Sequence, residues 1–115
     1  MAQQPARTAQ TAYAVGFKES YGALVATRPA IKEKFRTFLE FKTSIPPRVL
    51  PAGFKDHELG DRLKGYRECH LAGDILVVYT LKNNLLSLLM ICTHDELRGG
   101  REKDLARRLS GIHLK

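Results

Sequence analysis

Cysteine is scarce in this sequence, with two residues among 115 and no C-x-x-C spacing. That excludes a zinc ribbon and a fold held together by disulfides. Long apolar segments are also missing. The longest apolar run, residues 85–92, is interrupted by Ser87, whereas about 18 apolar residues are needed to span a bilayer. The first residues, MAQQPARTAQTA, contain no apolar signal core. We therefore expect a cytoplasmic protein that does not associate with membranes.

Negative charge is in the minority: 12 Asp and Glu stand against 19 Lys and Arg, which gives a formal net charge of +7. Such an excess is typical of proteins that bind polyanions, because cationic side chains release counterions from phosphates. A solvated basic surface and an acidic protein partner are the alternatives. The excess is concentrated in residues 98–115, where six basic residues accompany two acidic ones. Nucleic acid is one expected partner.

The length favours one domain spanning residues 1–115, because two separate cores would each be too small. We expect residues 1–10 to be frayed and residues 99–115 to form a basic C-terminal extension. A short first strand is predicted at residues 13–17. Two helices follow, separated by Arg28-Pro29. Their apolar stripes comprise Phe17, Tyr21, Leu24 and Val25, and then Ile31, Phe35, Phe38 and Leu39, with Lys42 on the same line.

The second half of the chain has the pattern of strands. After a proline-rich loop at residues 44–53, strands are predicted at residues 65–71, 75–81 and 85–92. The middle strand is apolar on both sides, as expected of a strand covered on both faces. Residues 101–110 predict a short basic helix that ends at Gly111. The result is an α+β fold, with two helices on one face of a three-stranded antiparallel meander.

Three histidines are predicted at the edges of this sheet. His57 lies in the loop before the meander, His70 ends the first strand, and His94 follows the last strand. Asp74 lies in the connection after His70. A metal site is one interpretation, although the separations match no compact ligand motif. The other is metal-free RNA cleavage, in which the 2′-hydroxyl is the nucleophile and histidines act as base and acid. Cations for the phosphate are available from Lys55, Lys64, Arg67 and Arg98.

Neither cysteine is expected to act as a nucleophile. Cys69 is predicted to face the other side of the sheet from His70, and Cys92 ends an apolar strand. Both are predicted core residues.

The stretch from Asp56 to Leu97 resembles the YafQ branch of the RelE superfamily of bacterial toxins. The shared elements are a DHxL loop, a KGYRxxH strand, an aspartate four residues further on, a hydrophobic meander and a closing THxxL. In this sequence they are DHEL at residues 56–59, KGYRECH at residues 64–70, Asp74, and THDEL at residues 93–97. With the upstream helices the resemblance covers residues 11–98 and implies a RelE-like fold.

This resemblance implies the toxin of a type II toxin–antitoxin pair, acting as a ribosome-dependent endoribonuclease. Such toxins cut mRNA in the ribosomal A site by 2′-hydroxyl attack, without a metal or other cofactor. His57, His70, Asp74 and His94 fall on functional positions of the family, with His94 as proton donor to the leaving group. The expected partners are the ribosome, mRNA and a cognate antitoxin.

Three features depart from the family pattern. Arg98 stands where an aromatic residue is usual, Cys92 stands where glycine is common, and residues 99–115 extend past the usual end. They leave open a weakened or inactive protein that binds the ribosome or an antitoxin without cutting. A ParE-like poison of DNA gyrase is a further alternative, but that branch is not expected to carry the histidine set.

Overall fold

The computed structural model describes residues 8–60, 63–93 and 107–111. Its sheet has five strands, β1 (Gln10–Tyr13), β2 (His57–Glu58), β3 (Arg67–Ala72), β4 (Ile75–Lys82) and β5 (Leu85–Thr93), in the order β1-β5-β4-β3-β2. β1 runs parallel to β5, and the other neighbours are antiparallel. The predicted meander of three strands is confirmed as β3, β4 and β5.

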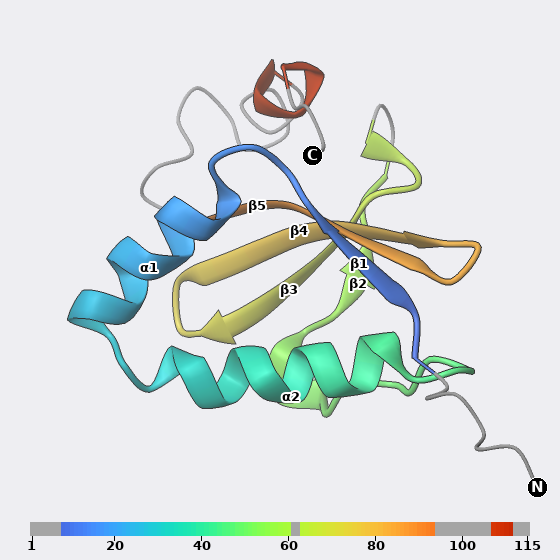
Figure 1. The fold of residues 1–115 in the computed structure, drawn as a ribbon, viewed down its shortest axis with the longest axis horizontal. Helices are drawn as coiled ribbons and strands as arrows, with labels where there is room; N and C mark the ends of the chain where they lie inside the picture. Colours follow the sequence, from blue (N-terminus) through green and yellow to red (C-terminus); the bar gives the residue numbers. More distant parts are fainter. Residues whose placement is uncertain (1–7, 61–62, 94–106, 112–115) are drawn as a thin grey trace, which may run out of the picture.

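Helices α1 (Phe17–Thr27) and α2 (Ile31–Thr43) cover one face of the sheet (Figure 1). Ile31, Phe35 and Phe38 are buried on one side of α2, and the Phe38 ring lies edge-on to Tyr79 of β4. Burial of this aromatic stripe holds the helix against the sheet, since each such side chain contributes about 1.5–3 kcal/mol. The prediction of two helices on one face is confirmed.

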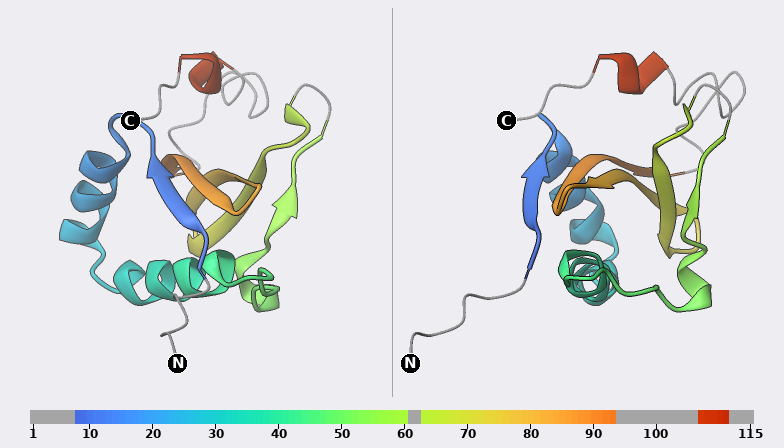
Figure 2. Two further views of the ribbon diagram at one scale, coloured as in Figure 1. Left: turned by 45° about the vertical axis from the view of Figure 1, so that its right-hand side comes forward. Right: turned by 90° about the vertical axis from the view of Figure 1, so that its right-hand side faces the viewer.

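The opposite face of the sheet is also covered, which explains why β4 is apolar on both sides. A second cluster contains Val78 of β4 and Met90 of β5, packed with Leu59, Leu63 and Leu109. Leu109 belongs to a helical segment at residues 107–110, which lies across the sheet from α2 (Figure 2). The predicted helix at 101–110 is therefore confirmed over these four residues, and its earlier part lies outside the described residues.

Two sequence-based boundaries are wrong. The first strand was predicted at residues 13–17, but β1 ends at Tyr13 and Phe17 already begins α1. Gly16 has φ +90°, which turns the chain out of the extended conformation just before the helix. His57 was predicted in a loop, but it lies in the two-residue edge strand β2, paired with Glu68 of β3.

The β4–β5 hairpin turns at Asn83 and Asn84, with φ of 52° and 61°. Two consecutive left-handed residues match the twist of the flanking strands. This confirms the predicted asparagine turn. None of the helices in the described part of the chain combines the length and apolar composition that crossing a bilayer needs.

Candidate active site

The carboxylate of Glu68 lies between two histidines. Its Oε1 atom is 3.6 Å from Nε2 of His57 and 3.9 Å from Nε2 of His70. The Glu68 side chain is fully buried, whereas the His57 side chain is 48% exposed and the His70 side chain 16% exposed. The imidazoles therefore lie between a buried negative charge and the solvent, where a nucleotide can reach them.

The strand pairing explains how these three side chains meet. Glu68 and His70 are two residues apart on β3, so both point to the sheet face opposite the helices. His57 is directly opposite Glu68 in the β2–β3 register. Residues paired in this way have neighbouring side chains on the same face. We call His57, Glu68 and His70 the histidine–carboxylate cluster.

Hydrogen bonds orient the two rings of the cluster. Nδ1 of His57 lies 2.7 Å from the carbonyl oxygen of Lys55, and Nδ1 of His70 lies 3.4 Å from that of Gly73. A carbonyl can only accept, so both Nδ1 atoms are donors. This orientation turns each Nε2 toward the Glu68 carboxylate. Imidazole rings held in this way can exchange protons with a substrate or contact a phosphate.

Asp56, the residue immediately before His57, is held in place by an ion pair with α2. Asp56 Oδ2 lies 2.7 Å from the Nζ atom of Lys42 on α2, and both side chains are only 9% exposed. The hydroxyl group of Tyr79 on β4 donates a hydrogen bond to Asp56 Oδ1 over 2.5 Å. A buried lysine on the apolar stripe of α2 is explained by this pair. The pair fixes the position of the residue that precedes His57.

Burial by itself would raise the pKa of Asp56. Hydrogen bonds from Lys42 and Tyr79, with the charges of Lys42 and Arg67, outweigh that effect and hold the pKa below its ordinary value of 3.8. Asp56 is therefore ionised in the folded protein at neutral pH. Burial, followed by the hydrogen bond to Asp56, raises the pKa of Tyr79, so its phenol stays protonated.

Arg67, which is predicted to bind substrate, contacts both Asp56 and Tyr79. Its Nε atom donates to the Tyr79 hydroxyl over 3.2 Å and is 3.4 Å from Asp56 Oδ1. Arg67 adjoins Glu68 along β3, so the two side chains point to opposite faces. The structure thus gives Arg67 a place on the helix side of the sheet, away from the histidine–carboxylate cluster.

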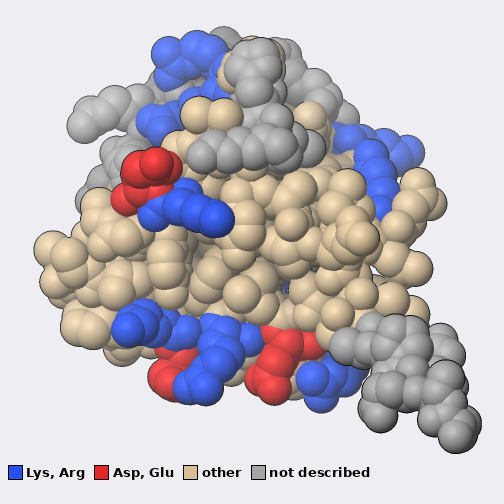
Figure 3. Space-filling view, in the orientation of Figure 1, with Lys and Arg blue, Asp and Glu red and all other residues tan. Residues whose placement is uncertain are grey.

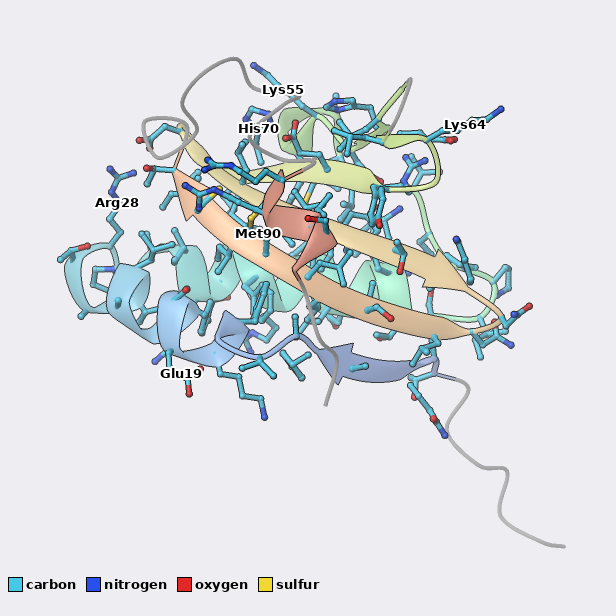
Figure 4. The ribbon with its side chains drawn as sticks, turned by 90° about the horizontal axis from the view of Figure 1, so that it is seen from above. Glu19, Arg28, Lys55, Lys64, His70 and Met90 are labelled. Carbon is cyan, nitrogen blue, oxygen red and sulfur yellow. The ribbon has the colours of Figure 1, made fainter. Side chains whose placement is uncertain are left out.

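Cations do gather beside His70. β2 pairs with Arg67 and Glu68, and among the described residues no strand pairs with this edge of β3 from Cys69 onward. A pocket of about 310 Å³ lies along this edge, lined by His70, Lys55 and Lys34 of α2. Figure 4 shows Lys55 and His70 close together at one end of β3. Two ammonium groups and an imidazole around one pocket suit a phosphate group.

Asp74 lies in the β3–β4 turn, where Gly73 has φ +51°. Its Oδ1 is 2.6 Å from Nη1 of Arg28, the residue that follows α1, and both side chains are partly exposed. The hydrogen bond to Asp74 raises the pKa of Arg28. Asp74 is therefore close in sequence to His70, but it contacts the end of α1.

Two predicted site residues, His94 and Arg98, lie outside the described residues. The last described residue before them, Thr93, is opposite Ile75 in the β4–β5 register. Lys64 lies at the other end of β3 from His70 (Figure 4).

Most of the sequence matches a family of bacterial toxins. Residues 9–99 match the model described as the bacterial toxin of type II toxin–antitoxin systems, YafQ. The chain belongs to this family. It is 37% identical over 68 residues to the mRNA interferase toxin YafQ of Escherichia coli K12, covering 59% of this chain and 71% of that protein.

Solved structures agree with this assignment to the YafQ family. YafQ in the DinJ–YafQ toxin–antitoxin complex of E. coli has a TM-score of 0.65 at 27% identity, covering 79% of this chain and 98% of that one. The YoeB/ParE toxin of Agrobacterium tumefaciens has a TM-score of 0.62 at 16% identity, covering 74% and 98%. The second likeness supports the RelE/ParE-type fold alone. The α+β fold predicted from the sequence is confirmed.

Sequence reasoning missed Glu68, Lys34 and Asp56 in this YafQ-family toxin. Side chains alternate between the two faces of a strand, so Glu68 and His70, which are two residues apart, are expected on the same face. This alternation could have identified Glu68 from the sequence. The Asp56–Lys42 pair could have been suspected because Lys42 falls on the same helix face as the aromatic residues of α2, where a buried cation needs a partner.

Both cysteines are buried, as predicted, Cys69 in the helix-side cluster and Cys92 in the opposite one. Burial, followed by the charge of Asp56, raises the pKa of the Cys69 thiol. A protonated, buried thiol is a poor nucleophile. Among the described residues, no group of three His, Cys, Asp or Glu side chains is placed to hold a metal ion.

Proposed function

We propose that this YafQ-family toxin is an mRNA interferase, an endoribonuclease that cuts mRNA in the ribosomal A site without a metal ion. The name of the E. coli relative supports the reaction class. The observation that carries the proposal is the histidine–carboxylate cluster, in which His57 and His70 share the buried Glu68 carboxylate at a solvent-exposed edge.

The chemistry needs no nucleophile from the protein. The 2′-oxygen of the RNA attacks the adjacent phosphorus and loses its proton, the bond to the 5′-oxygen breaks, and that oxygen takes up a proton. The products are a 2′,3′-cyclic phosphate and a 5′-hydroxyl. His94 gives the proton to the leaving oxygen. His57, His70 and Asp74 share the removal of the 2′-proton and the stabilisation of the phosphate.

Cations complete the proposed site. Lys55 and Lys34 line the pocket beside His70 and bind the scissile phosphate or its neighbour. Lys64 and Arg98 contact the RNA further along the strand. Arg67 holds the Asp56–Tyr79 anchor in place, so we assign it a positioning role instead of the predicted substrate contact.

The proposed partners are the ribosome, mRNA and a cognate antitoxin. The E. coli relative has been solved in complex with the DinJ antitoxin, which supports an antitoxin as partner. The net charge of +7 suits ribosomal RNA and mRNA. We place the protein in the cytoplasm, where translating ribosomes are found.

The second candidate is a member of the family that binds ribosome or antitoxin without cutting. Cys92 favours it, because the family pattern commonly has glycine there and the Cys92 side chain is buried two residues before His94.

Primer extension on translating ribosomes separates the two candidates. The purified parent toxin and its His94→Ala variant are compared. Cleavage that is lost in His94→Ala supports the nuclease. Stalled translation on intact message supports the binder and contradicts the nuclease. 2′,3′-cyclic phosphate ends on the cut message support the metal-free reaction, whereas 3′-hydroxyl and 5′-phosphate ends contradict it.

A further inference from the structure

A second pocket lies on the same sheet face as the histidine–carboxylate cluster, at the other end of the strands. Its volume is about 370 Å³. It is bounded by the turn before β3, the ends of β4 and β5, and the C-terminal helical segment. The lining residues are Lys64, Gly65, Tyr66, Thr80, Lys82, Ser87, Leu89 and Leu109.

The strand register brings the polar lining together. Thr80 is directly opposite Ser87 in the β4–β5 pair, and Lys82 follows Thr80 by two residues. These side chains therefore share one face. A Cβ atom built on Gly65 would lie 3.8 Å from the Nζ atom of Lys82, so the ammonium group reaches across to the neighbouring turn.

Two ammonium groups line this pocket, and within residues 8–60, 63–93 and 107–111 no carboxylate lines it. Among the described residues, neither Lys64 nor Lys82 has an ion-pair partner. The nearby Glu58 accepts a hydrogen bond from the Gly65 backbone N–H through Oε2. An anion is the ligand that two unpaired ammonium groups and a threonine hydroxyl fit best.

The pocket depends on a segment that the family match does not include. Leu109 closes one side of it, and the match ends at residue 99. Leu109 is buried against Val78 and Met90, and Val78 is directly opposite Glu68 of the cluster in the β3–β4 register. The C-terminal segment thus adds a wall to the face that carries the proposed catalytic side chains.

We propose that this pocket is a second subsite for the RNA strand, which binds a backbone phosphate between Lys64 and Lys82 away from the scissile bond. Tyr66 and Glu68 are two residues apart and on the same side, a spacing of about 7 Å along extended chain. One RNA strand therefore reaches from the cluster to the pocket. The half-buried Tyr66 ring beside the pocket can stack on a base. This inference rests on the proposed function.

The subsite is tested by binding, without the ribosome and without cleavage. The probe is a fluorescent single-stranded RNA of twelve 2′-O-methyl nucleotides, which cannot be cut by 2′-hydroxyl attack. Its affinity is measured by anisotropy against salt concentration for Lys82→Glu and for Lys32→Glu. Lys32 is exposed on α2, and its substitution changes the net charge equally. Thermal unfolding checks that both variants fold as the parent does.

We expect Lys82→Glu to weaken binding about tenfold, and Lys32→Glu less than about twofold. Lys82→Ala should lower the slope of log K against log salt by about 0.7, because one phosphate contact is lost. Equal effects of Lys82→Glu and Lys32→Glu would overturn the subsite.

The outcome stays separate from that of the proposed function. If the toxin cuts mRNA on ribosomes but Lys82→Glu binds RNA as Lys32→Glu does, only the subsite fails. If Lys82→Glu weakens RNA binding and no cleavage occurs, only the nuclease fails. Unchanged RNA binding with loss of antitoxin binding would assign the pocket to the protein partner and contradict the RNA subsite.

Discussion

The Nζ atom of Lys42 lies 2.7 Å from Oδ2 of Asp56, and each of the two side chains is 9% exposed. The pair joins α2 to the chain segment immediately before His57. The histidine is itself exposed and belongs to a strand of two residues, so the ion pair adds to the short pairing of β2 with β3. We therefore regard this ion pair as the support of the candidate site.

Replacing Lys42 by methionine should destabilise the fold. The variant leaves the Asp56 charge buried without its nearest cation, and removing one partner of a buried pair costs about 3 kcal/mol. Urea denaturation measures the loss. Lys32→Met on the exposed side of the same helix is the matched control, with an expected change within about 0.5 kcal/mol. Equal stability of the two variants would show that the pair contributes nothing.

The same carboxylate predicts how stability depends on pH. The pKa of Asp56 is lowered in the folded protein, so its contribution is complete above the ordinary pKa near 3.8 and is lost as pH falls through the lower, folded value. The difference in unfolding free energy between the parent and Asp56→Asn should be constant from pH 7 to about 5 and shrink below about 4. A difference that grows on acidification would contradict the assigned shift.

Glu68→Gln should reduce cleavage by about tenfold or more, because the amide removes the negative charge that faces Nε2 of His57 and Nε2 of His70. The cleavage rate is measured on translating ribosomes, with thermal unfolding alongside. Glu40→Gln, exposed on α2, is the control. A variant with the parent's rate would remove Glu68 from the site.

The Arg28–Asp74 pair lets a role for Asp74 in the reaction be distinguished from a role in the fold. If Asp74 acts on the substrate, Asp74→Asn loses cleavage while Arg28→Ala retains it. The measurement is again primer extension, with thermal unfolding alongside. Equal losses in both variants, accompanied by equal shifts in Tm, would assign Asp74 to holding the β3–β4 turn against the end of α1.

Much of this fold can be predicted from the sequence, because the patterns that indicate it lie within single helices and strands. The α2 stripe from Ile31 to Phe38 and the apolar β4 strand carry their periods within one element. β2 could not be predicted, because two residues have no period and pair only through the position of β3. The His57–Glu68 contact depends on that pairing, as the Lys42–Asp56 contact depends on how α2 docks.

The sequence singled out the histidines of the candidate site, but it did not indicate which charged side chains lie beside them. His57 and His70 stand out because histidine is uncommon and lies at strand ends. Arg67 was assigned to substrate by sequence proximity, but strand alternation turns it to the helix side, where Asp56 and Tyr79 bind it. Which cations reach the phosphate is decided by the tertiary packing of η1 (Ala52–Phe54) and α2 against β3. The charged side chains along the α2 edge in Figure 3 are of both signs, so that edge provides matched control substitutions.

The most direct test of the account is cleavage of mRNA on translating ribosomes by the parent and by His57→Ala and His70→Ala. The toxin is expected to leave 2′,3′-cyclic phosphate ends, and each variant to cut at least about 100-fold more slowly while folding with the parent's Tm. Cleavage at the parent's rate by both variants would contradict the claim that the histidine–carboxylate cluster carries the reaction.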